Sequence, residues 1–68
     1  MSLRADMLST INEDLRTMVT IGVLSPLEHV NRIDQAKHME TRELVTTMNF
    51  THDEACAYVW DHNTSQAV

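Results

Sequence analysis

The stretch TIGVLSPLEHV, residues 20–30, ends one helix and begins another within a few residues. Gly22 is the natural residue just past a helix end, because glycine adopts the left-handed backbone conformation without a steric penalty. Ser25, Pro26 and Glu28 then follow in the order of an N-cap, a first helical residue and the return half of a capping box. So short a connection predicts two helices that lie side by side as an antiparallel hairpin.

The segment before this turn has the apolar spacing of a helix over residues 3–20. Its apolar residues follow one another at steps of three or four, which places them on one face. They are Leu8, Ile11, Leu15 and Met18. The segment after the turn carries a second apolar set close to the reversal, namely Leu27, Val30 and Ile33. We expect the two sets to pack together, as a core or as the seam of a dimer.

The second helix is less regular, and two interpretations are open for it. Steps of three between apolar residues make the apolar line wind around a helix. Either the helix breaks near Glu40 and Thr41, with Thr41 capping a new start, or one helix over residues 26–48 contacts different partners along its length. No Gly or Pro marks a break, so we predict the single helix. Its apolar residues on more than one side predict a homodimer, in which two hairpins form a helical bundle.

A short third helix is predicted over residues 51–62. Thr51 and Glu54 have the spacing of a capping box, in which the two side chains satisfy N–H groups at a helix start. Residues 63–68 are expected to form a frayed tail. The prediction is therefore an all-α fold in one small domain, residues 1–62, with this tail attached.

The composition argues against several classes of function. Five Lys and Arg residues stand against ten Asp and Glu residues, which gives a net charge of −5. A chain this acidic is a poor ligand for nucleic acid, because phosphate binding needs clustered cations. No secretory signal and no apolar run of membrane-spanning length are visible. The single Cys favours a reducing compartment, so we expect a cytoplasmic protein that does not bind membranes.

His52 and Cys56 are the pair whose spacing best suits chemistry. Four residues apart on a helix, they share a face and could bind one zinc ion, with His62 as a further ligand. A closed zinc site needs four ligands, and no other donor has a suitable spacing. Catalysis by Cys56 needs a paired base, an orienting group and a pocket, for which a short helical chain has little room. We predict no enzymatic activity, no metal and no cofactor.

Met39, Tyr58 and Trp60 are the residues expected to face a partner. A small domain cannot bury a short aromatic helix on every side, and aromatic residues are enriched at protein interfaces. Methionine adapts readily to a binding surface. The predicted function is that of a non-enzymatic protein-interaction module, which binds a larger protein as an inhibitor, adaptor or accessory subunit.

The composition also indicates a possible source, and the function has alternatives from other classes. Small acidic chains of this kind are frequent in bacteriophages and other mobile elements, which would place this one in the host cytoplasm. The alternatives are a small-molecule or nucleotide binder at a protomer interface, a zinc-dependent structural element and a DNA-binding dimer.

Overall fold

Three α-helices make up the computed structural model, which describes residues 2–66. They are α1 (Leu3–Thr20), α2 (Pro26–Lys37) and α3 (Thr41–Gln66). No strand is present in the part of the chain that the structure describes. The predicted all-α fold class is therefore confirmed.

Local hydrogen bonds explain both ends of α1. The hydroxyl of Ser2 accepts a bond from the N–H of Ala5 at 3.0 Å and caps the first turn. Past the last turn, Gly22 has a φ of 86°, and the N–H of Val23 donates to the carbonyl of Met18 at 3.0 Å. This pattern is a Schellman stop, which needs a residue that tolerates the left-handed conformation.

The helix α2 begins three residues after that stop. The hydroxyl of Ser25 accepts a bond from the N–H of Glu28 at 3.1 Å, and Pro26 is the first helical residue. The carboxylate of Glu28 turns forward along the helix, where it pairs with Arg32 at 3.5 Å. Ser25 and Pro26 therefore start α2 by the mechanism that the sequence indicates.

The predicted single helix over residues 26–48 is wrong, because residues 38–40 are not helical and separate α2 from α3. The alternative start at Thr41 is the one observed. A contact from another helix satisfies the last carbonyl of α2, since the guanidinium of Arg4 donates to the carbonyl of Lys37 at 2.9 Å. The carbonyl of Glu40 then accepts the first bonds of α3. The carbonyls of Gln35 and Ala36 accept bonds from the N–H groups of His38 and Met39, so the end of α2 is satisfied without a Gly or a Pro.

The predicted separate helix over residues 51–62 is also wrong, because α3 is continuous from Thr41 to Gln66. Thr51 is buried in the interior of α3, and Glu54 pairs with Arg32 of α2 at 3.2 Å instead of capping a helix start. Residues 63–66, expected in a frayed tail, extend the helix. Residues 67 and 68 of that tail lie outside the described residues.

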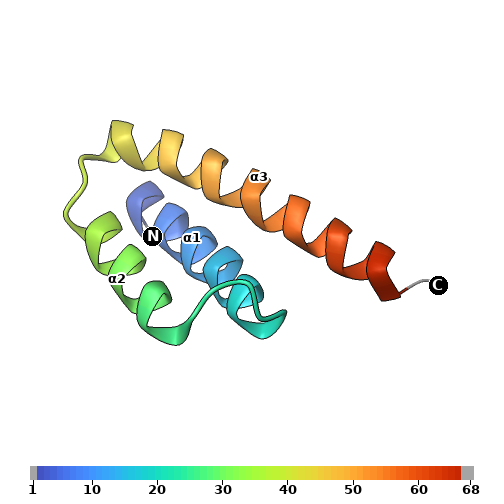
Figure 1. The fold of residues 1–68 in the computed structure, drawn as a ribbon. Helices are drawn as coiled ribbons and strands as arrows, with labels where there is room; N and C mark the ends of the chain where they lie inside the picture. Colours follow the sequence, from blue (N-terminus) through green and yellow to red (C-terminus); the bar gives the residue numbers. More distant parts are fainter. Residues whose placement is uncertain (1, 67–68) are drawn as a thin grey trace.

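The first helix lies between the other two (Figure 1). α2 runs antiparallel to α1, as the short turn predicts, whereas α3 runs in the same direction as α1 (Figure 1). The molecule measures 42 × 21 × 18 Å. Its long dimension follows from α3, whose 26 residues span about 39 Å.

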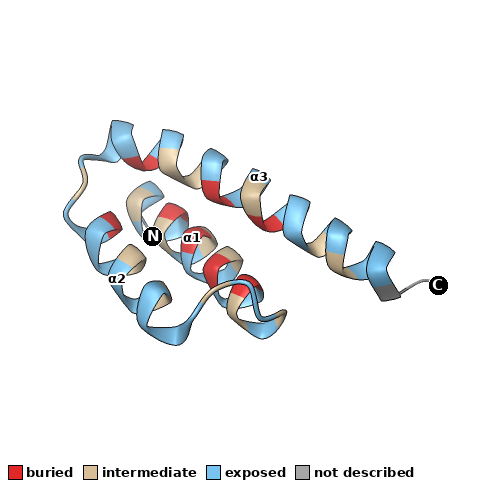
Figure 2. Ribbon diagram, viewed as in Figure 1, coloured by how far each residue is buried: buried red, intermediate tan, exposed pale blue. Residues whose placement is uncertain are grey.

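The core lies where α1 meets its two neighbours (Figure 2). Its buried apolar residues are Met7, Ile11, Leu15, Met18, Ala36, Leu44 and Ala55. Leu8 and Ile33 pack at its edge. Leu27 and Val30, expected in the same seam, are 70% and 59% exposed, so they do not belong to the core of the single chain. The reason is rotation: with Ala36 facing α1, the 3.6-residue period turns Leu27 and Val30 to the outer side of α2.

Candidate functional site

Three side chains with reactive or titratable groups lie close together in the groove between α1 and α3. His52 and Cys56 come from successive turns of α3, and Asp14 comes from α1. The Nδ1 atom of His52 lies 3.3 and 3.2 Å from the two carboxylate oxygens of Asp14. The Sγ atom of Cys56 lies 3.6 Å from Nε2 of the same imidazole. The imidazole therefore stands between a carboxylate and a thiol.

The two helices explain why these side chains meet. Residues four apart on α3 lie on one face, so His52 and Cys56 are neighbours. Asp14 precedes the buried Leu15 on α1 and so lies at the edge of the packed face. The Asp14 side chain is only 16% exposed, against 59% for that of His52, and Cys56 is exposed. The carboxylate is thus held inside the groove while the thiol faces solvent.

The hydrogen-bond partners select one tautomer of neutral His52. An ionised carboxylate can only accept hydrogen bonds, so Nδ1 carries the hydrogen and donates a hydrogen bond to Asp14. Nε2 is then left with a lone pair, to which the thiol of Cys56 can donate. This is the order of nucleophile, base and orienting carboxylate that activates a weak nucleophile.

A cavity of about 250 Å³ opens beside Cys56, between α1 and the last turns of α3. Its lining consists of Asp14, Thr17, Ala55, Cys56, Val59, Trp60 and Asn63. Asp14 is the one charged residue of this lining, and Val59 and Trp60 supply large apolar surfaces. The cavity is smaller than a typical drug-sized site, so it suits a small organic group.

The backbone around Cys56 supplies no oxyanion hole for acyl transfer. That chemistry needs free N–H donors to stabilise an oxyanion. The backbone N–H groups around Cys56 belong to the interior of α3, where each one donates to the carbonyl one turn earlier. The arrangement therefore suits reactions at the sulfur atom itself.

The predicted zinc alternative does not gain a third ligand here. Within the described part of the chain, no group of three or more His, Cys, Asp and Glu side chains is placed to hold a metal ion. His62 lies ten residues beyond His52 on α3, which is about 15 Å along the helix axis. Cys56 and His52 alone would leave a zinc ion with two of the four ligands of a structural site.

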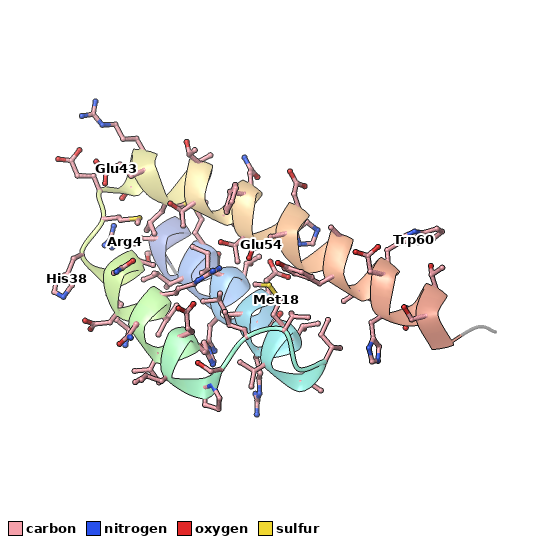
Figure 3. All side chains as sticks on the ribbon, viewed as in Figure 1. Arg4, Met18, His38, Glu43, Glu54 and Trp60 are labelled. Atoms are coloured by element: carbon pink, nitrogen blue, oxygen red, sulfur yellow. The ribbon has the colours of Figure 1, made fainter. Side chains whose placement is uncertain are left out.

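The three residues expected to face a partner do not share a surface. Met39 is half-buried against the core, and its sulfur accepts a hydrogen bond from the Thr47 hydroxyl at 3.2 Å. Tyr58 and Trp60 are two residues apart, so they point to nearly opposite sides of α3. Trp60, which also lines the cavity, is 72% exposed, and Figure 3 shows its side chain projecting from the ribbon of α3. Of the three, Trp60 is the residue most open to a partner.

Asp14 is the one residue of the candidate site that the sequence alone did not indicate. It is one of ten acidic residues, and its immediate neighbours on α1 give it no distinctive spacing. The one available signal is its place beside Leu15 at the edge of the apolar seam. That position becomes meaningful only when α3 is known to run along α1.

Comparisons with protein-family models, with curated proteins and with solved structures gave no significant match. None of the helices in the described part of the chain is both long enough and apolar enough to cross a membrane. The functional assignment therefore rests on the residues of this chain.

Proposed function

We propose that this chain is a small, non-enzymatic protein-interaction module that binds a larger protein as an inhibitor, adaptor or accessory subunit. The single observation that carries the proposal is the exposure of Trp60 near the free end of α3. A tryptophan in water leaves a large apolar surface unburied, and tryptophan is among the residues most enriched at interface hot spots.

The length of α3 supports this role. His52 lies beside Asp14, and α1 and α3 run in the same direction, so the end of α1 at Thr20 comes level with Tyr58. The turns that follow Tyr58 extend beyond α1, and they carry Trp60 with them. A partner can therefore approach Trp60 without displacing the core.

Charge indicates what kind of partner fits this end of α3. Four acidic residues and no Lys or Arg lie between positions 43 and 66. Asp61 adjoins Trp60, and Asp53 lies two turns earlier on the same face. The complementary surface is an apolar socket for the indole with Lys or Arg at its rim, because opposite charges steer association and fix its register.

Trp60→Ala is expected to weaken binding to such a partner by at least about 2 kcal/mol, or about 30-fold in Kd. The partner is first captured from a bacterial lysate on the tagged chain, then purified, and its affinity is measured by calorimetry at two salt concentrations.

Phe50→Ala is the matched control, because Phe50 is an aromatic residue of the same helix whose side chain is also largely exposed, at 67%. The control should keep the affinity of the native chain, and binding should weaken at higher salt. A lysate that yields no partner, or a partner that Trp60→Ala retains equally well, would contradict the proposal.

We also propose that the chain forms a homodimer through the outer side of α2. Leu27 and Val30 lie one turn apart on that side, and both are large apolar residues open to solvent. A chain of only 68 residues has a small core and gains stability from burying such a pair against a second copy. Light scattering at micromolar concentration should give twice the mass of one chain. Leu27→Asp should return the chain to a monomer, whereas Val45→Asp on α3 should not. A native chain that scatters as a monomer would contradict this proposal.

A further inference from the structure

The hydrogen-bonded series Asp14–His52–Cys56 has no role in the packing of the core. None of the three side chains belongs to the buried apolar cluster, although that of Asp14 is only 16% exposed. The binding role proposed above does not need them either. The arrangement nevertheless places a thiol, a base and an orienting carboxylate in sequence, beside a cavity.

The geometry gives each group a chemical task. Nε2 of His52 is the atom nearest to the thiol, and its lone pair is free because Nδ1 donates to Asp14. The thiolate, and not the thiol, is the nucleophile in reactions at sulfur. A base in this position takes the proton as the sulfur attacks, and Asp14 stabilises the imidazolium that forms.

We propose that Cys56 is a reactive thiol that undergoes exchange with small disulfides seated in the cavity beside it, so that this groove is a site of reversible modification. His52 acts as the base and Asp14 as its positioning residue. The two proposals share Trp60, which lines this cavity and is also exposed to solvent. The exchange reaction is measured on the purified chain without a partner, so its outcome does not depend on the partner-binding role.

The exchange balances without any further oxidant. The sulfur of Cys56 attacks one sulfur of the disulfide R–S–S–R, and a new Cys56–S–S–R bond forms as the old S–S bond breaks. The proton of the thiol passes to Nε2 of His52 and then to the departing thiolate, which leaves as R–SH. No oxyanion develops at any point, so the reaction needs no free backbone N–H donor, and those around Cys56 are bonded within α3.

The lining of the cavity indicates which disulfides react fastest. Asp14 is its one charged residue, and the face of the Trp60 indole attracts cations. A disulfide with cationic arms is therefore favoured over one with anionic arms. Cystamine and 3,3′-dithiodipropionate test this point, because their arms have similar lengths and opposite charges.

The experiment measures the rate of mixed-disulfide formation at pH 7 by mass spectrometry, with each of these two disulfides. In the native chain, cystamine should react at least about fivefold faster than dithiodipropionate. His52→Ala should slow the cystamine reaction about tenfold, and added imidazole should restore part of that rate, because it replaces the missing base. Alanine is a strong helix former, and far-UV circular dichroism checks that α3 is intact.

Two further variants separate the proposed roles from general effects. His62→Ala removes a different imidazole from α3 and should leave the rate within about twofold of the native value. Asp14→Asn should slow the reaction and also remove the preference for cystamine, which a merely structural residue would not control. The proposal is overturned if His52→Ala reacts at the native rate, if His62→Ala slows the reaction equally, or if imidazole restores nothing.

Discussion

Replacing Leu15 by alanine is expected to lower the free energy of unfolding by about 2–5 kcal/mol. Leu15 is 1% exposed and lies on α1, the helix that contacts both of the others. Its truncation removes apolar contacts and leaves a cavity that only partial relaxation can fill. Small domains are marginally stable, so a loss of this size should leave much of the chain unfolded at 25 °C. Urea denaturation followed by circular dichroism measures the effect.

Leu27→Ala is the matched control for this prediction. It makes the same chemical change on the outer side of α2, where the native side chain is 70% exposed. At a concentration too low for self-association, it should change the free energy of unfolding by less than about 0.5 kcal/mol. Equal effects of the two substitutions would show that the core does not lie where α1 meets its neighbours.

The second large effect is expected from Asn49→Pro, which should lower the free energy of unfolding by about 3 kcal/mol or more. Asn49 lies in the interior of α3, and its side chain is exposed. The loss therefore comes from the backbone, because proline cannot donate to the preceding turn and its ring clashes with a carbonyl there. Thermal and urea unfolding of the variant measure the cost.

The same position distinguishes the observed helix from the one that the sequence indicates. If residues 49 and 50 formed a linker before a helix start at Thr51, a proline at 49 would be nearly harmless. Asn49→Ala controls for the loss of the side chain and should leave the stability unchanged or raise it by a few tenths of a kcal/mol. A proline variant as stable as this control would contradict a continuous α3.

The sequence predicts α1 and the turn after it because their signals are local. Gly22, Ser25 and Pro26 each act on backbone groups within a few residues, and such contacts are visible as spacing. The end of α2 has no such signal. Its last carbonyl is satisfied by Arg4, which lies 33 positions away in the chain.

The prediction of a helix start at Thr51 was wrong for a related reason. The pair Thr51 and Glu54 has the pattern of a capping box, but tertiary contacts overrode that pattern. Thr51 is buried in the packed face of α3, and Glu54 reaches Arg32 on α2. A pattern that suits a helix start was also compatible with a helix interior, and packing decided between them.

The candidate site also has a part that the sequence indicates and a part that depends on contacts between helices. The spacing of His52 and Cys56 follows from one helix and was visible in the sequence. Their link to Asp14 depends on the parallel alignment of α1 and α3, which no residue pattern in either helix specifies. The exposure of Trp60 likewise depends on the length by which α3 extends past α1.

The partner surface at Trp60 and the cavity beside Cys56 both depend on α3 being one helix from Thr41 to Gln66. Amide hydrogen exchange of Asn49, Phe50 and Thr51, measured by NMR, tests this most directly. Inside a continuous helix these N–H groups are hydrogen-bonded, so they should be protected to the same degree as their neighbours on either side. Exchange of these three amides at the rate of an unstructured peptide, between protected flanking turns, would contradict the account.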